Sequence, residues 1–170
     1  MLNFKEILPD KQSLERIAAL YCTCFNAPEK GENWTMESAL TYFRERIAEG
    51  SIFAGVEDEG ALSGICCGGP YERSFLARDL GRDYPGHFYI SLVAVTEEAR
   101  GRGLGVFMVN AFCAMAAAQG FTGAIVRCRA ENTAMLAVLA RAGFTEIERY
   151  SAELGGVTCE RVVLRKGLSF

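Results

Sequence analysis

The sequence predicts an α/β fold of the layered α+β kind, in which helices cover both faces of a mixed sheet. Short apolar strands alternate with segments whose apolar residues recur at helical spacing. A hairpin pattern interrupts this alternation, and a second hairpin pattern closes the chain. Parallel and antiparallel strands must therefore share one sheet. We expect about seven strands and four helices.

The first half of the chain is predicted to supply three strands and two helices. Residues 11–25 and 35–49 carry apolar side chains at helical spacing, and Gly50 stands where a C-terminal cap is expected. The acidic turn 57–60 separates two short apolar runs, which is typical of an antiparallel hairpin. The three predicted strands cover residues 4–8, 51–56 and 62–68.

The second half is predicted to alternate strands and helices before its final hairpin. Gly81, Pro85 and Gly86 interrupt residues 71–86, so we expect a mobile loop there with about one helical turn, as a candidate lid. The Gly155-Gly156 turn joins the last two strands. The predicted strands cover 87–95, 123–129, 144–153 and 157–165, and the predicted helices cover 103–120 and 133–142.

Length and composition indicate one soluble domain, residues 1–170. Half of the 170 residues are apolar and 23% are charged, which is an ordinary globular composition. A net charge of −3 argues against a nucleic-acid binder that relies on a basic surface. No apolar run approaches the roughly 18 residues of a membrane span. The oligomeric state is left open, with a homodimer as one arrangement.

The seven cysteines are predicted to be core residues in a reducing compartment. They are odd in number, and most lie in apolar stretches, so a disulfide framework is not expected. They lack the paired spacing and the accompanying histidines of a zinc site, so no metal is predicted. The first ten residues contain no apolar core of an export signal. We therefore expect a cytoplasmic protein.

The most informative stretch places a glycine-rich turn between a strand and a helix. Residues 92–95 form the apolar strand end, and Arg100-Gly101-Arg102-Gly103-Leu104-Gly105 leads into the helix. Such a turn exposes backbone N–H groups at the positive end of the helix and so predicts an anion site, unless the glycines only make a tight turn. A dinucleotide fingerprint would need glycine in place of Val106, and the Gly-Lys pair of a Walker loop is absent.

The turn matches the pattern R/Q-x-x-G-x-G/A, as Arg100-x-x-Gly103-x-Gly105, and here the sequence resembles the GNAT N-acetyltransferase superfamily. A second likeness follows the next strand, where Asn132 and Ala134 precede Gly143-Phe144, similar to the family's N-x-x-A element that ends in G-F. Ala134 stands one residue earlier than the family spacing. The likeness covers residues 87–144 well and the flanking elements by their order.

The resemblance implies a GNAT fold that binds acetyl-CoA as a co-substrate. It implies that backbone amides of the turn hold the coenzyme pyrophosphate. It also implies that two neighbouring strands, 87–95 and 123–129, splay apart and that the first pairs with the pantetheine arm. Asn132 would lie close to that arm, and its other expected role is to cap the following helix. The residues implied in coenzyme binding are Val93, Ala94, Val95, Arg100, Gly101, Arg102, Gly103, Leu104, Gly105 and Asn132.

A general base is needed because an alkyl amine attacks a thioester only in its neutral form. His87 is the one histidine in the sequence and stands thirteen residues before Arg100, where some family members are implied to carry a carboxylate base. It is the candidate catalytic residue, and the alternative is an exposed loop histidine. Glu97 and Glu98 could act through water or could be solvated charges. The resemblance also implies an oxyanion donor in a backbone N–H near Val93.

One position departs from the family pattern. Many members carry a tyrosine seven residues after the Asn132 position, where it protonates the leaving thiolate, and this sequence has Leu139 there. A thiol with a pKa near 8.5 is a fair leaving group without that donor. Cys128 also lies on the strand beside the expected gap. Because no activating base is evident next to it, we interpret it as a core residue.

The acceptor side is less defined by the sequence. Arg127 and Arg129 are two residues apart on a strand and so share a face. They could hold an acidic acceptor group, bind a coenzyme phosphate, or pair with acids such as Glu146 and Glu148. Four aromatic residues near the first two helices either line the acceptor pocket or pack in the core. They are Phe25, Trp34, Tyr42 and Phe43.

Together these observations predict an acetyl-CoA-dependent N-acetyltransferase. It would move the acetyl group to a primary amine of a small molecule or peptide by direct attack in a ternary complex, with no nucleic acid or membrane partner. Two other readings stay open. The first is a catalytically weak module that binds acetyl-CoA, and the second is a regulatory protein that uses the fold as a scaffold.

Overall fold

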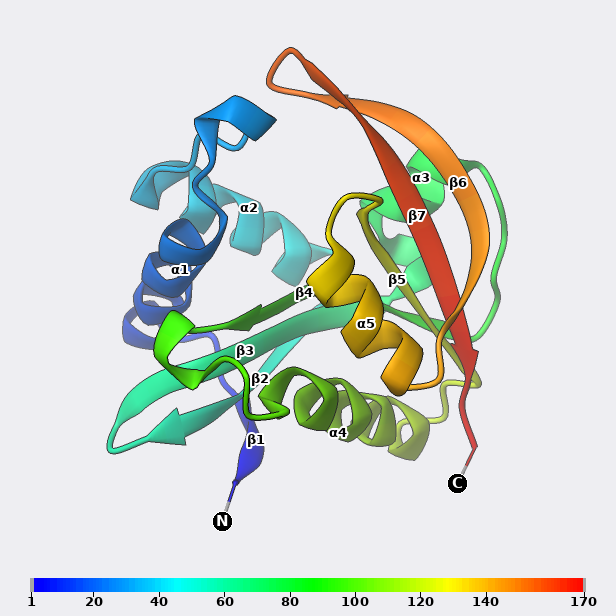
Figure 1. Ribbon diagram of the computed structural model, residues 1–170. Helices are drawn as coiled ribbons and strands as arrows, with labels where there is room; N and C mark the ends of the chain where they lie inside the picture. The colour runs from blue at the N-terminus through cyan, green and yellow to red at the C-terminus, as the bar shows by residue number, and fades with distance from the viewer. Residues whose placement is uncertain (1, 170) are drawn as a thin grey trace.

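A seven-stranded sheet organises the computed structural model, which describes residues 2–169 (Figure 1). Its strand order is β1-β2-β3-β4-β5-β7-β6. The strands are β1 (Phe4–Ile7), β2 (Ile52–Asp58), β3 (Ala61–Pro70), β4 (His87–Val95), β5 (Gly123–Arg129), β6 (Thr145–Leu154) and β7 (Val157–Gly167). The helices are α1 (Lys11–Phe25), α2 (Met36–Ala48), α3 (Phe75–Leu80), α4 (Leu104–Ala118) and α5 (Thr133–Arg141), with short 3-10 turns η1 (Pro28–Lys30), η2 (Tyr71–Arg73) and η3 (Glu97–Ala99).

The sheet is mixed, as predicted. Strands β4 and β5 are parallel, because α4 carries the chain back to the edge where β4 begins. The other neighbouring strands are antiparallel. Both hairpins predicted from the sequence form, β2 with β3 and β6 with β7. The α/β fold class and the order of the strands are therefore confirmed.

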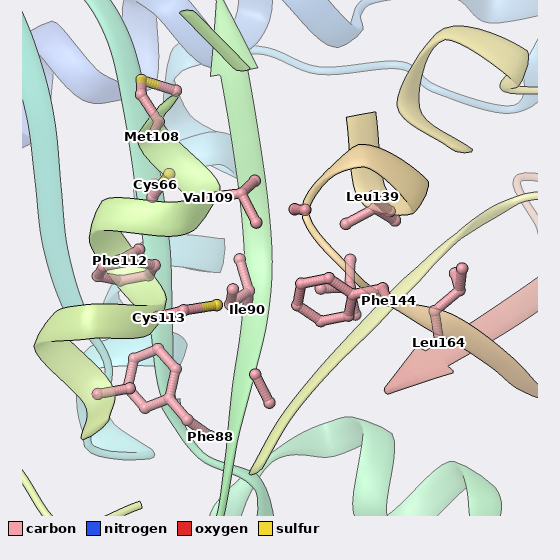
Figure 2. Packing of buried hydrophobic residues seen from close by; sticks show 14 of the residues in the cluster. Cys66, Phe88, Ile90, Met108, Val109, Phe112, Cys113, Leu139, Phe144 and Leu164 are labelled. Carbon is pink, nitrogen blue, oxygen red and sulfur yellow. The ribbon is translucent and has the colours of Figure 1, made fainter. Parts of the chain in front are cut away.

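Helices cover both faces of the sheet (Figure 1). Helices α4 and α5 pack on one face over the largest buried cluster, in which Leu139, Val109 and Phe144 meet side chains from β4 and β7 (Figure 2). Helices α1 and α2 cover the other face through a second cluster that includes Ile17 and Phe43. A third cluster lies under α3.

The helix caps follow the local sequence. Asp10 accepts a hydrogen bond from the Ser13 N–H at the start of α1. Thr35 and Ser38 form a reciprocal capping box at the start of α2. Each cap satisfies N–H groups that the first helical turn leaves without a backbone partner. These helices thereby begin within one residue of their predicted positions.

The prediction of a mobile loop is wrong for residues 71–80, while residues 81–86 contain no helix or strand. The segment begins with η2 and α3, so residues 2–169 contain five α-helices rather than four. Ser74 caps α3 by accepting from the Ala77 N–H, while Leu76 and Tyr71 are buried against the sheet. A six-residue helix is too short for the periodicity that reveals a helix in sequence. Because its apolar side chains are buried in the third cluster, we do not propose this segment as a lid.

The structure also answers three questions about the described chain, on disulfides, membrane spans and metal ligands. All seven cysteines are free thiols, and four of them are buried. None of the helices described between residues 2 and 169 is long and apolar enough to span a membrane. Within the same residues, no group of three or more His, Cys, Asp or Glu side chains is placed to hold a metal ion.

Candidate active site

A gap between β4 and β5 divides the sheet at its centre. The two strands pair only where His87–Ile90 lies beside Gly123–Val126. Beyond that point β4 continues to Val95 and β5 continues to Arg129, and no pairing between them is found in the described chain. On its other side β4 remains paired with β3 as far as Val95. The implied splaying of these strands is therefore confirmed, and β4 has one open edge.

A β-bulge lies where the two strands part. Ile90 pairs with Gly68 and Leu92 pairs with Cys67, so Ser91 is the extra residue. A bulge bends the strand that carries it and increases its twist. The Ser91 hydroxyl donates to the Cys67 carbonyl oxygen at 3.3 Å and thereby ties the bulge to β3. The bulge gives one physical reason why β4 turns away from β5 here.

The start of α4 offers free backbone donors next to this gap. The first hydrogen bond of the helix runs from the Phe107 N–H to the Gly103 carbonyl oxygen. Among the described residues, the N–H groups of positions 101–106 have no backbone acceptor, and no side chain caps the helix. Free N–H groups and the positive end of a fifteen-residue helix together form an anion site.

The glycines of the turn have two different roles. Gly101 and Gly103 adopt positive φ angles of 79° and 76°, which favour glycine. A Cβ atom at either position would meet no other atom within 4 Å, so the space beside the main chain is open. A Cβ atom at Gly105 would lie 3.3 Å from Val138 Cγ2 of α5. The third glycine therefore allows α4 and α5 to pack closely.

The arginines of the turn are exposed, and one of them also braces the strand. Arg100 Nε donates to the Val95 carbonyl oxygen at 3.1 Å, and the Cys24 thiol donates to the same oxygen at 3.7 Å. Arg102 has no ion-pair partner within residues 2–169. Leu104 and Ala94 are buried, so these two positions offer main-chain groups to a ligand.

Asn132 caps α5, as the sequence suggested. Its Oδ1 accepts from the Met135 N–H at 3.1 Å. The residue is exposed and follows the free end of β5. The cap therefore fixes where α5 begins, beside the open arm of the gap.

His87 lies at the opposite end of β4 from the open edge. It is 8% exposed, and both ring nitrogens have protein partners. Nδ1 lies 3.0 Å from the Pro85 carbonyl oxygen, and Arg165 Nε donates to Nε2 at 2.7 Å. Six residues of strand, roughly 20 Å, separate His87 from Val93. The structure therefore does not bring the histidine to the gap, and its contacts join β4 to β7.

We expect His87→Ala to destabilise the protein without removing a catalytic base. The substitution leaves the half-buried Arg165 without its acceptor, which should cost about 1–3 kcal/mol of unfolding free energy. Chemical denaturation checks the stability, and the pH dependence of kcat/KM checks the catalysis. Arg165→Leu, which leaves the imidazole in place, is the matched control. If the pH profile of kcat/KM lost its acid limb in His87→Ala but kept it in Arg165→Leu, the histidine would be the base after all.

Two further predicted positions are buried in the core. Leu139, where many family members carry tyrosine, is 0% exposed and packs within the cluster under α4 and α5. Cys128 is 8% exposed, and burial raises the pKa of its thiol to about 11, with Arg161 opposing that shift. A thiol of high pKa carries little thiolate at neutral pH. Its burial and pKa agree with the interpretation of Cys128 as a core residue.

Arg127 and Arg129 point to the face that carries α1, α2 and α3. Arg127 Nη1 donates to the Tyr150 hydroxyl at 2.8 Å and lies 3.6 Å from an Asp79 carboxylate oxygen. Arg129 Nη2 donates to the Lys30 carbonyl oxygen at 2.6 Å. The carboxylates of Glu32 and Glu131 lie 3.5 Å from Arg129. The acids beside these arginines are therefore not Glu146 and Glu148, which pair with Arg149 and Arg82.

Sequence analysis missed several polar groups on this same face. Arg161 on β7 lies opposite Arg129 and opposite Tyr150. Tyr89 on β4 is 4% exposed, and burial raises the pKa of its hydroxyl, which stays protonated. Arg46 on α2 is buried and forms a two-bond ion pair with Glu49. The sequence holds no signal for this grouping, since strand register and helix packing create it.

The aromatic residues near α1 and α2 form one cluster around Tyr21. Phe43 is fully buried and so belongs to the core. Trp34 and Tyr42 are half-buried and line a shallow surface depression of about 460 Å³ beside α2. Of the four aromatics considered from the sequence, these two line this depression, and Phe25 is also half-buried.

Comparison with known proteins identifies the class that this fold and gap define. The model of the acetyltransferase (GNAT) family matches residues 14–144. The chain therefore belongs to the GNAT acetyltransferases, which transfer acetyl groups from acetyl-CoA. No curated protein matches the sequence at a significant level.

Solved structures of acetyltransferases share the fold. A ribosomal-protein-alanine N-acetyltransferase from Brucella melitensis is 20% identical, with a TM-score of 0.73 over 98% of this chain and 100% of that chain. An N-acetyltransferase from Staphylococcus aureus Mu50 is 16% identical, with a TM-score of 0.73 over 98% and 99%. A GNAT superfamily phosphinothricin acetyltransferase from Sinorhizobium meliloti, solved with AcCoA, is 17% identical, with a TM-score of 0.73 over 98% and 88%.

The groups of this chain fit acetyl-CoA as the co-substrate. A pyrophosphate needs several donors and close access to the main chain, and the start of α4 has free N–H groups with open space at Gly101 and Gly103. A pantetheine arm carries amides that can pair with a strand, and β4 has an open edge.

Proposed function

We propose that the protein acetylates a primary amine of a small molecule or peptide by direct attack on acetyl-CoA in a ternary complex. The observation that carries the proposal is the continuity of two features. The open edge of β4 leads through η3 into the uncapped start of α4. One extended ligand with a diphosphate at one end and amides along its arm can use both sites.

We assign the coenzyme contacts mainly to the main chain. The N–H groups of positions 101–106 would hold the pyrophosphate, with Arg100 and Arg102 adding positive charge. The backbone of Val93, Ala94 and Val95 would pair with the pantetheine arm. Asn132, at the start of α5, would lie beside that arm.

Bound acetyl-CoA supplies an activated acetyl group as a thioester. A backbone N–H of β4 near Val93 would donate to the thioester oxygen, where negative charge develops. The amine nitrogen bonds to the carbonyl carbon, and the carbon–sulfur bond breaks, so coenzyme A leaves as a thiolate that takes a proton from solvent. The nitrogen loses its proton to solvent.

Steady-state kinetics test this proposal. Release of coenzyme thiol should depend on an added primary amine, and mass spectrometry should find that amine one acetyl group heavier. Double-reciprocal lines at several acetyl-CoA concentrations should intersect, because both substrates bind before reaction. Parallel lines, or an acetylated Cys128, would indicate a covalent enzyme intermediate and contradict direct attack.

A catalytically weak acetyl-CoA-binding module is the second candidate, and the buried Leu139 favours it. The position that supplies a thiolate proton donor in many family members is apolar and fully buried here. This alternative expects acetyl-CoA to raise the melting temperature while no primary amine stimulates thiol release. A protein that binds no acetyl-CoA would contradict both candidates.

A further inference from the structure

Arg161 is a cation without a protein partner on the acceptor face. Its Nε atom is buried and has no hydrogen-bond partner. Within residues 2–169 its guanidinium also forms no salt bridge. Across the sheet it lies directly opposite Arg129, a residue of the same charge. Arg161 is half-buried, and a buried Nε atom without a hydrogen-bond partner opposite a like charge is unfavourable, so this arrangement indicates an anion that is supplied from outside the chain.

Arg127 lies near Arg161 and has N–H groups that donate no hydrogen bond within the protein. Tyr150 lies opposite Arg161 on β6, and its hydroxyl accepts from Arg127 Nη1. The acid beside Arg127 is Asp79, whose side chain is 53% exposed and whose carboxylate lies at 3.6 Å. In the described chain, Nε and Nη2 of Arg127 donate no hydrogen bond, and neither is among the buried atoms without a partner. These two donors therefore reach accessible space.

Two neighbouring arginines of this face, Arg46 and Arg129, are already neutralised. Glu49 accepts two hydrogen bonds from Arg46, at 2.9 and 3.0 Å. Arg129 is held by the Lys30 carbonyl oxygen and by two carboxylates. Arg165 also lies on this face, but its contact with His87 is at the other end of β4. Where β4 and β5 part, the least compensated positive charge therefore belongs to Arg161 and to Arg127, whose acid is the exposed Asp79.

The position of Arg127 and Arg161 relative to the gap decides whether they bind the acceptor or the coenzyme phosphates. Arg127 is the first residue of β5 beyond the last pair with β4, so it stands where the two strands part. Its side chain contacts Phe75 of α3, on the face opposite α4. The anion site for a diphosphate lies at the start of α4. The two arginines therefore face the acceptor rather than the coenzyme phosphates.

We propose that the acceptor is a small amine that carries a free carboxylate, bound between Arg127 and Arg161. This inference rests on the proposed acetyl transfer and names its substrate class. Guanidinium groups bind a carboxylate through paired hydrogen bonds, and Tyr150 holds Arg127 in position for this. The carboxylate and the amine must lie on one compact molecule, because Arg127 stands at the point where β4 and β5 part. A free amino acid has a carboxylate close to its amine and so meets this requirement. The N-terminus of a peptide has no carboxylate that close when the neighbouring side chains are apolar.

Matched acceptors test this inference. Free amino acids are compared with the corresponding amino acid carboxamides, which have the same side chain and no carboxylate. We expect the wild-type protein to have at least a tenfold higher kcat/KM for some of the acids than for their amides. The difference in basicity works against the expected result. The amine of an amino acid carboxamide is less basic than that of the free acid, so a larger share of it is in the reactive neutral form. Equal or better use of the amides would overturn the inference while leaving the proposed acetyl transfer intact.

Arg161→Gln is the decisive variant. Because Arg161 has no protein partner, the substitution is expected to preserve the fold, which its melting temperature checks. We expect kcat/KM for the preferred amino acid to fall about 10- to 100-fold, with the amide rate and the KM for acetyl-CoA unchanged. Arg161→Lys should retain part of the preference. Arg141→Gln, the same change at an exposed position on α5, should retain all of it. A full preference in Arg161→Gln would overturn the inference.

A binding measurement separates this inference from the proposed function. The melting temperature is measured with coenzyme A present, with and without the amino acids or their amides. An upward shift with an acid, lost in Arg161→Gln, supports the carboxylate site even if no acetyl transfer occurs. No shift with any acid, together with no acid preference in the kinetics, overturns the site.

Discussion

Replacing Gly103 by alanine is expected to weaken acetyl-CoA binding about 10- to 100-fold. The methyl group would project into the open space beside the free N–H groups at the start of α4, where we place the pyrophosphate. Losing one or two hydrogen bonds to a charged group has this effect on affinity. Alanine at φ 76° also costs about 1–2 kcal/mol of stability. Calorimetric titration with acetyl-CoA measures the affinity, and chemical denaturation measures the stability.

Gly120→Ala is the matched control for Gly103→Ala. Gly120 follows the other end of α4, has a φ of 94°, and a Cβ atom there would also meet nothing within 4 Å. Both variants should therefore lose similar stability, while Gly120→Ala should bind acetyl-CoA like the wild-type protein. Equal affinity in the two variants would argue against a phosphate site at the start of α4.

The phosphate turn could be predicted because its requirements are local. A main chain that must adopt positive φ and leave room for a ligand is encoded as glycine within a few residues, at Gly101 and Gly103. The strand before the turn and the helix after it have strong periodicities of their own. The order of the strands followed from the alternation of apolar patterns and turns, whereas the splaying of β4 from β5 followed from the family resemblance rather than from any single residue.

The catalytic side could not be predicted in the same way. Offset along the chain put His87 on β4, but the sequence does not say that the open edge of β4 is at the other end of that strand. Arg161 has no motif, and only the pairing of β7 with β5 and β6 brings it opposite Arg129 and Tyr150. The bulge at Ser91 is likewise a property of strand register, which depends on long-range pairing.

For Arg127 and Arg129, the sequence predicts the face of the sheet correctly but not the acidic partners. Alternation along a strand correctly places Arg127 and Arg129 on one side of the sheet. Their acidic neighbours come from α3, the segment after η1 and the end of β5 rather than from β6. A sequence gives the direction of a side chain relative to its own strand, whereas the opposing layer depends on the packing of helices that are distant in sequence.

Leu139→Ala should destabilise the protein by about 2–5 kcal/mol, through lost burial and the cavity left behind. Leu139 is 0% exposed and shares a buried cluster with Val109 of α4 and Phe144 before β6 (Figure 2). Leu136→Ala, the same change at a half-buried position of α5, should cost clearly less. Denaturant unfolding of both variants measures the difference. Equal losses would show that Leu139 does not close the core between α4, α5 and the sheet.

Leu139→Tyr separates the structural role of this position from a catalytic one. A larger side chain with a hydroxyl group must enter a closed apolar cluster, so we expect a loss of about 1–3 kcal/mol from overpacking, and more if the hydroxyl finds no partner. Turnover should not rise, because a side chain in that cluster does not reach the leaving thiolate in the gap. A higher kcat in Leu139→Tyr, with a basic limb that reports a new acid, would show instead that this position faces the coenzyme and that the lost donor limits the reaction.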